Sequence, residues 1–252
     1  MHIDVVELEQ FYKSQLGYLV QRSIRARMRH LWPNVAEDTV LGLGFPNPIM
    51  TRYGNEALRS VVGMPAGQGA GWWNPRGKNA TSLVFENELP FPDLSFDRII
   101  ALHLLENTDD LTGTLEEIWR VLSPEGRFVA IVPNRASLWA RLERTPFGHG
   151  RPFSRRQLVN LLSEMGFSPE RHVQALFFPP SKARIMLRMA GPWERLQIGM
   201  FGQMGGVHVI EVVKHVHGVV PSKGARSRVR LGVGRPVLQP ALGRNARTQK
   251  GA

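Results

Sequence analysis

The sequence predicts an α/β fold in which helices cover both faces of a mostly parallel sheet. Short apolar runs typical of buried strands, such as Thr39–Gly44 and Phe96–Leu102, alternate along the chain with segments of helical periodicity. This alternation is the pattern of strand–helix–strand units. The 252 residues are 42% hydrophobic and 21% charged, so most of the chain can fold around one sizeable core.

Helical periodicity begins near the N-terminus. Apolar residues between Leu8 and Leu31 predict one long or broken helix that ends before Trp32 and Pro33, with Gly17 as a candidate dividing point. Further helices are expected at residues 53–59, 111–122 and 154–165. The last of these begins with a capping box, because Gln157 follows Ser154 at the required spacing.

Five strands are expected before the last helix, at residues 39–44, 61–64, 82–86, 96–102 and 128–132. Two more, near residues 173–178 and 207–213, would form an antiparallel edge of the sheet. Residues 65–79 are rich in glycine and proline and predict a loop. The sequence therefore divides into an N-terminal helical segment (1–37), an α/β domain (38–220) and a tail (221–252).

The formal net charge of +11 is concentrated in the tail. Residues 221–252 contain eight basic residues and no acid, which leaves 24 basic residues against 21 acids in the rest of the chain. The tail has few aromatic residues and is expected to be disordered. It could contact nucleic acid weakly through counterion release, or it could serve only as a solubilising extension.

Several classes of protein are disfavoured by what the sequence lacks. There is no cysteine, so disulfides, thiolate metal sites and cysteine nucleophiles are excluded. His215 and His217 share a predicted strand face but have no third ligand, so no metal site is expected. The acidic N-terminus does not resemble a secretory signal, and no apolar run suffices for a membrane span. We therefore expect a cytoplasmic protein with no membrane contact.

Three motifs in the middle of the chain carry a family resemblance. The turn Leu89-Pro-Phe-Pro-Asp-Leu-Ser-Phe-Asp97, the strand end Leu105-Glu106, and the segment 116–127 with its Arg-Val-Leu-Ser-Pro-Glu-Gly run occur in that order. Together they resemble the small-molecule, type 11-like branch of the class I S-adenosylmethionine-dependent methyltransferases, over roughly residues 38–180. The resemblance implies a Rossmann-like fold with a seven-stranded sheet and S-adenosylmethionine as cofactor.

The resemblance also implies a site at the carboxyl ends of the strands, where a ligand meets the turn after the first strand. Its cofactor-binding candidates are Gly42, Gly44, Phe45, Glu86, Asn87 and His103. Glu86 would accept from the adenine amino group, or it is simply a solvated strand end. His103 is a weak candidate for a catalytic base, because a lone histidine at a strand end more often packs or contacts the cofactor.

The first motif departs from the family pattern. Where the family has an acid and three glycines, this chain reads Gly42-Leu-Gly-Phe-Pro-Asn-Pro48, and proline has no N–H to donate. The end of the second strand, at residues 62–65, offers no carboxylate that would bind ribose. Two hypotheses follow: a methyltransferase with altered cofactor contacts, or a catalytically silent methyltransferase-like interaction protein. A weak RNA-binding module is a third.

The segment after the fifth strand predicts the acceptor class. Residues 133–156 contain six arginines and three aromatic residues against one acid, Glu143. Arginines between aromatic rings can bind an anionic or nucleotide-like acceptor, for which Arg144, His149 and Arg151 are the candidates. The alternative is a lid whose arginines pair with nearby acids. The acceptor itself is not identified by the sequence.

Overall fold

The computed structural model describes residues 3–73, 77–181 and 205–215. The chain divides into one compact unit at residues 1–216 and a second unit at residues 217–252. The predicted disordered tail at 221–252 and the predicted His215–His217 pairing therefore lie wholly or partly outside the described residues.

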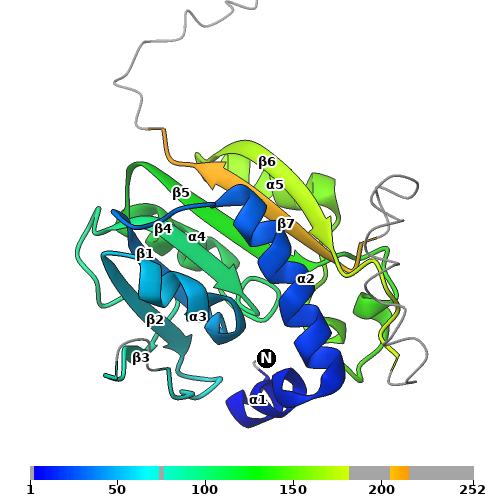
Figure 1. The fold of residues 1–252 in the computed structure, drawn as a ribbon. Coiled ribbons are helices and arrows are strands. Elements are labelled where there is room, and N and C mark those ends of the chain that lie inside the picture. Colours follow the sequence, from blue (N-terminus) through cyan, green and yellow to red (C-terminus); the bar gives the residue numbers. More distant parts are fainter. Residues whose placement is uncertain (1–2, 74–76, 182–204, 216–252) are drawn as a thin grey trace, which may run out of the picture. The chain divides into compact units, whose positions relative to one another are not determined.

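A seven-stranded sheet forms the centre of the first unit, with the order β3-β2-β1-β4-β5-β7-β6 (Figure 1). Its strands are β1 (Thr39–Gly44), β2 (Arg59–Pro65), β3 (Thr81–Val84), β4 (Phe96–Leu102), β5 (Leu122–Pro133), β6 (Ser168–Ala175) and β7 (Val207–Val213). Only β7 runs antiparallel to its neighbours, β5 and β6. The predicted Rossmann-like fold with a mostly parallel seven-stranded sheet is confirmed.

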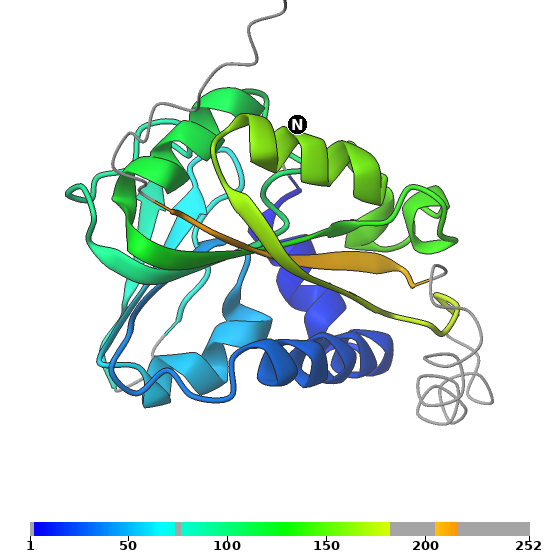
Figure 2. The same ribbon diagram turned by 90° about the horizontal axis from the view of Figure 1, so that it is seen from above.

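Helices cover both faces of this sheet (Figure 2). One face carries α2 (Gln15–Leu31) and α3 (Asn47–Glu56), the other carries α4 (Leu111–Val121) and α5 (Arg155–Glu164), and α1 (Val5–Lys13) lies across the end of the sheet. Two short 3₁₀ helices, η1 (Trp139–Arg141) and η2 (Pro146–Gly148), follow β5. Each face packs its own cluster of buried apolar side chains against the strands. The Ser154–Gln157 capping box of α5 is confirmed.

Several boundaries differ from the predicted ones, among them the start of β5, which lies at Leu122 and not at 128. The third helix spans Asn47–Glu56, not 53–59, because Pro48 lies in its first turn, where a missing N–H costs no helical hydrogen bond. The N-terminal helix breaks at Ser14, whose hydroxyl caps α2 by accepting from the Gly17 amide. Strand β6 begins at Ser168, five residues before its predicted start.

A buried carboxylate joins α2 to the antiparallel edge of the sheet. The Glu211 side chain on β7 is fully buried and accepts from the Trp32 indole at 2.7 Å and from the Arg171 guanidinium. Arg171 also donates to the Leu31 carbonyl at the end of α2. Burial alone would raise the pKa of Glu211, but the hydrogen bonds from Arg171 and Trp32 outweigh it and lower that pKa.

Candidate functional site

The turn after β1 is held against β4 by a glycine. Gly44 has a φ of +82°, and a Cβ atom there would lie 2.3 Å from the Leu102 carbonyl oxygen. The next amide, that of Phe45, donates to the same oxygen at 2.8 Å. No other residue tolerates both the left-handed backbone and the close approach, so the local sequence fixes this turn at the carboxyl end of the sheet.

The same turn offers a ligand few amide donors. The Phe45 amide is already bonded to Leu102, and the Ile49 amide bonds the Pro46 carbonyl at the start of α3. Pro46 and Pro48 have no N–H. Gly42 lies inside β1, where a Cβ would come within 2.5 Å of Pro46 Cγ, so the structure gives this glycine a packing role.

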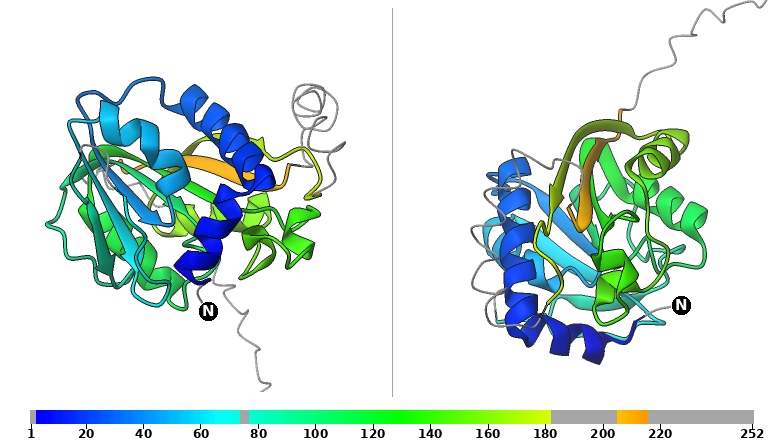
Figure 3. Two further views of the ribbon diagram at one scale, coloured as in Figure 1. Left: turned by 60° about the horizontal axis from the view of Figure 1, so that its bottom comes forward. Right: turned by 90° about the vertical axis from the view of Figure 1, so that its right-hand side faces the viewer.

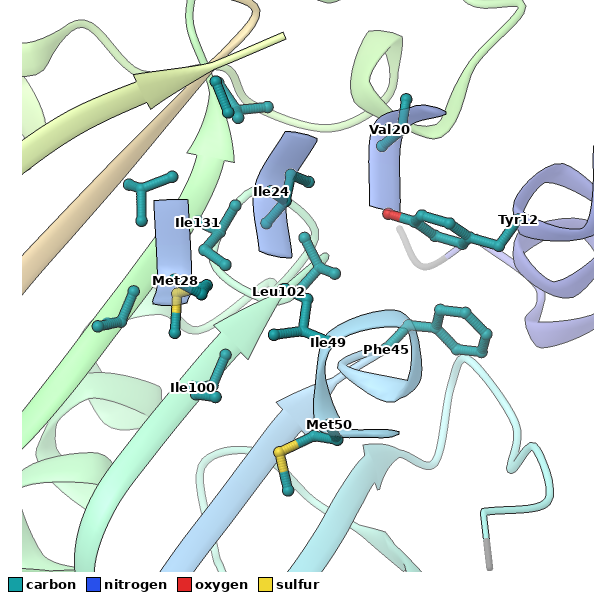
Figure 4. Packing of buried hydrophobic residues seen from close by; sticks show 14 of the residues in the cluster. Tyr12, Val20, Ile24, Met28, Phe45, Ile49, Met50, Ile100, Leu102 and Ile131 are labelled. Atoms are coloured by element: carbon teal, nitrogen blue, oxygen red, sulfur yellow. The ribbon is translucent and has the colours of Figure 1, made fainter. Parts of the chain in front are cut away.

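Helix α1 crosses the carboxyl ends of the strands (Figure 3). From it, the Tyr12 ring stacks on Phe45 with 5.7 Å between centroids, as the close-up shows (Figure 4). The Tyr12 hydroxyl lies 2.8 Å from Nε2 of His103. Phe45 is 2% exposed and His103 is 0% exposed, so neither side chain is accessible to a ligand in this arrangement.

Behind His103 lies a second buried ionisable group. Glu106 Oε1 is 3.3 Å from His103 Nδ1, and both side chains are fully buried. Neither carboxyl oxygen of Glu106 has a hydrogen-bond partner in the part of the chain that the structure describes. Burial, and then the charge of Glu106, raise the pKa of Tyr12 well above its ordinary value. A Tyr12 hydroxyl that stays protonated and donates to Nε2 places the ring proton of His103 on Nδ1, facing Glu106.

The backbone at His103 is unusual and helps to define the site. His103, the first residue after β4, has a φ of +56°, in the left-handed region that few residues other than glycine adopt. The ring packs against Phe147 of η2 at 4.8 Å between centroids. Sequence reasoning found His103 but missed Tyr12 and Glu106. A carboxylate at the end of the apolar run Leu104-Leu105-Glu106 was the available signal for the latter.

The remaining cofactor candidates lie beyond β3. Glu86 is partly exposed two residues after the strand ends, and Asn87 is exposed and donates to the Asp110 carboxylate at 3.2 Å. No carboxylate follows β2, whose last four residues are all buried. Instead a buried amide, that of Gln68, donates to the Gly44 carbonyl at 3.3 Å. Gln68 is thus the polar side chain that the β2–β3 loop brings to the turn.

The predicted acceptor residues lie in the segment between η1 and α5 and differ in exposure. Arg151 is exposed, but its backbone amide donates to the Glu106 carbonyl at 2.7 Å. This hydrogen bond fixes the loop beside the buried side chains of His103 and Glu106. Arg144 is exposed and His149 is half-buried in the loop that joins η1 to α5. The loop therefore reaches the site through Phe147 and the Arg151 backbone, while the Arg144 guanidinium is directed to solvent.

Two further properties bear on the chemistry. Within residues 3–73, 77–181 and 205–215, no group of three histidine, aspartate or glutamate side chains could hold a metal ion. None of the helices in this part of the chain has the length and apolar character needed to cross a membrane.

Comparisons with known proteins agree with this fold. A family model described as a methyltransferase domain matches residues 42–172, just over half of the chain. A demethylmenaquinone methyltransferase from Deinococcus radiodurans is 32% identical over 136 residues, which are 51% of this chain and 55% of that protein. A menaquinone and ubiquinone C-methyltransferase from Desulfotalea psychrophila is 38% identical over 66 residues, 26% of this chain and 23% of that protein. The chain thus spans about half or less of the length of these relatives.

Solved structures share the fold at lower identity. A possible histamine N-methyltransferase from Thermotoga maritima has a TM-score of 0.59 at 18% identity, covering 83% of this chain and 96% of that one. A methyltransferase from Archaeoglobus fulgidus has a TM-score of 0.55 at 19% identity, covering 82% and 97%. The class uses S-adenosylmethionine as methyl donor. On the match over residues 42–172, this chain belongs to the class I S-adenosylmethionine-dependent methyltransferase family.

Proposed function

We propose that this protein transfers a methyl group from S-adenosylmethionine to a hydroxylated aromatic acceptor, with His103 as the base. The observation that carries the proposal is Tyr12, which is itself a hydroxylated aromatic ring. Its hydroxyl is bound by His103 Nε2 and its ring stacks on Phe45, within a water-poor cluster of aromatic side chains. When α1 moves, an acceptor of the same chemistry fits the place that Tyr12 vacates.

The residues fit the cofactor only in part. The Gly44–Phe45 turn and the partly exposed Glu86 are our candidates for the backbone and adenine contacts of the family pattern. β2 ends without a carboxylate for the ribose, and the following loop brings the Gln68 amide to the Gly44 carbonyl. When bound, the cofactor would supply an electrophilic methyl group. We therefore assign the chain's own residues to acceptor binding and proton removal.

The proximity of His103 and Glu106 supports the assignment of proton removal to His103. With the ring proton on Nδ1, the free Nε2 takes the proton of the acceptor hydroxyl as the O–H bond breaks. The imidazolium that forms faces the Glu106 carboxylate at 3.3 Å, which stabilises its charge. The acceptor oxygen or its neighbouring ring carbon becomes the nucleophile. Glu106 is thus a positioning residue that acts through His103.

The names of the relatives are consistent with this acceptor class. Demethylmenaquinone, the acceptor named for the Deinococcus radiodurans protein, is a ring of this kind in its reduced form. Arg144, His149 and Arg151 remain candidates for binding an anionic group elsewhere on the acceptor. Contact of the basic tail with nucleic acid remains a prediction.

Calorimetric titration with S-adenosylhomocysteine is the first test. We expect micromolar binding that Glu86→Ala weakens, while Glu88→Ala, an exposed residue two positions along, leaves it unchanged. Methyl transfer to a reduced short-chain demethylmenaquinone then tests the base. We expect His103→Gln to lower kcat by about 10²–10⁴-fold, and Glu106→Gln to shift the pH profile of kcat. His30→Gln, an exposed histidine on α2, is the control.

A second function is favoured by one observation. The side chains of α1 fill the place above Phe45 and His103, and Pro46 and Pro48 remove amide donors from the turn. A protein with these features could keep the fold as a cofactor-free interaction partner. The absence of any heat or thermal shift at millimolar S-adenosylhomocysteine would support this second function and contradict the first.

A further inference from the structure

A cavity of about 430 Å³ lies at the carboxyl end of β5 and involves none of the residues assigned to methyl transfer. Its wall includes Arg135 after β5, Ser154 and Arg155 at the start of α5, His172 and Gln174 on β6, and His208 on β7. His208 alternates with Val207 and Val209, which pack on the α2 side of the sheet. The cavity is therefore on the opposite face, beneath the N-terminus of α5.

The charge around the cavity is entirely positive. Arg135 and Arg155 are exposed, and neither guanidinium forms a hydrogen bond or ion pair within the described part of the chain. No carboxylate is among the residues that line the cavity. The first turn of α5 adds backbone N–H groups, because the capping box satisfies only some of the amides there.

A buried donor without an acceptor also lines the cavity. The Gly205 amide donates to Gln174 Oε1 at 3.0 Å, which fixes the Gln174 side chain so that its NH₂ group faces Nδ1 of His208. His172 Nε2 lies 3.0 Å from the same Nδ1. Because the Gln174 NH₂ group can only donate, Nδ1 of His208 accepts from it, and neutral His208 then carries its proton on Nε2.

That Nε2–H group is the second observation that points to a ligand. His208 is only 2% exposed, and its Nε2 has no hydrogen-bond partner in the residues that the structure describes. A buried N–H group is normally satisfied, so an oxygen atom that the described residues do not supply is the partner that this geometry lacks. The guanidinium groups of Arg135 and Arg155, which line the same cavity, favour an oxygen atom that carries negative charge.

We propose that this cavity binds a phosphate-type oxyanion, held by Arg135 and Arg155 and by the Nε2–H group of His208. The site is independent of the methyl-transfer site, because it lies between α5 and the antiparallel edge of the sheet. A phosphate group on a small metabolite has the size and charge that the cavity accepts.

Binding couples to protonation of the histidine pair. Burial, and then the charge of Arg155, lower the pKa of His172 to about 4, and burial with the charges of His172 and Arg155 lowers that of His208 to about 4. The groups that face the pair are Arg135, Arg155 and Gln174, none of them acidic. A bound dianion raises these pKa values, so the complex takes up a proton. Affinity therefore increases as the pH falls from 7 toward 5.

Sulfate titration of the full chain tests the site, because the charge of sulfate does not change in this pH range. Ring-nitrogen NMR signals of His172 and His208 report binding at this cavity and exclude binding by the basic tail. We expect saturable shifts of both rings, a Kd at pH 5.5 at least threefold below that at pH 7, and at least tenfold weaker binding by Arg155→Gln. Arg156→Gln, an exposed neighbour that does not line the cavity, is the matched control.

His208→Phe provides a second variant that keeps the ring volume but removes the donor. It should abolish the saturable shift of His172 while the protein keeps the amide spectrum of a folded chain. Three results would overturn the proposal: no saturable shift of either ring at tens of millimolar sulfate, equal affinity in Arg155→Gln and Arg156→Gln, or a Kd that does not change with pH.

Discussion

Weakening the docking of α1 should increase the affinity for S-adenosylhomocysteine. Leu8 lies on the inner face of α1 and is 0% exposed, in the same buried cluster as Tyr12 and Phe45. Leu8→Ala removes about 2–5 kcal/mol of packing where such a side chain is fully buried. Because Phe45 and His103 are covered while α1 is docked, this loss shifts the equilibrium toward the open, binding-competent state.

The expected size follows from the population of the open state. The apparent Kd equals the intrinsic Kd divided by the fraction of molecules that can bind. A loss of about 2 kcal/mol increases a minor open population about 30-fold, so the apparent Kd should fall by about 30-fold or until the open state predominates. Val6→Ala is the matched control, because Val6 is on the same helix but 56% exposed, and it should change the Kd by less than about twofold.

Calorimetry measures the Kd, and hydrogen exchange of the α1 amides measures the opening. The two together separate the possible outcomes. If the α1 amides of Leu8→Ala exchange faster than those of the wild type while the Kd is the same or higher, α1 does not control access to the site. The closed arrangement of Tyr12 over His103 would then have no bearing on cofactor binding.

Three further predictions concern stability and its dependence on pH. Glu211→Ala leaves the guanidinium groups of Arg127 and Arg171 and the indole of Trp32 without their buried partner, so it should lower the free energy of unfolding by about 3–5 kcal/mol in chemical denaturation. Glu170→Gln at the surface should lower it by less than about 0.5 kcal/mol. A loss below about 1 kcal/mol for Glu211→Ala would contradict the role of this carboxylate. The lowered pKa of Glu211 makes its contribution complete above the pKa of the unfolded chain, and it is lost as the pH falls through the folded value. Gly44→Ala should lower Tm far more than Gly77→Ala. Both glycines have a positive φ, but of the two only Gly44 has an atom within 4 Å of the added Cβ. Equal Tm values would contradict the close approach of Gly44 to the Leu102 carbonyl. His208 has a pKa of about 4 in the folded chain and binds a proton more readily when the chain is unfolded, so stability should fall as the pH drops from about 6.5 toward 4. His208→Phe should flatten this dependence of stability on pH. An unchanged dependence would contradict a buried neutral ring at this position.

The sequence by itself determined the features that depend on near neighbours. Alternation of apolar runs and helical stripes was enough for the α/β architecture, because each element shows its buried face in its own periodicity. The α5 capping box lies within four residues, and Gly44 marks a turn that other residues would strain. The start of α3 was predicted too late, because Pro48 lies in its first turn although proline in a sequence often indicates the end of a helix.

The tertiary structure alone decided which side chains meet. Tyr12 and His103 are 91 positions apart in the chain, and His172 and His208 are 36 apart, so no spacing rule joins either pair. Burial of Glu106 could not be predicted either, because a carboxylate after a strand is solvated unless a distant loop and helix cover it. These contacts depend on how α1, η2 and the antiparallel edge pack on the sheet. Long-range packing, rather than local preference, therefore sets the chemistry of both sites.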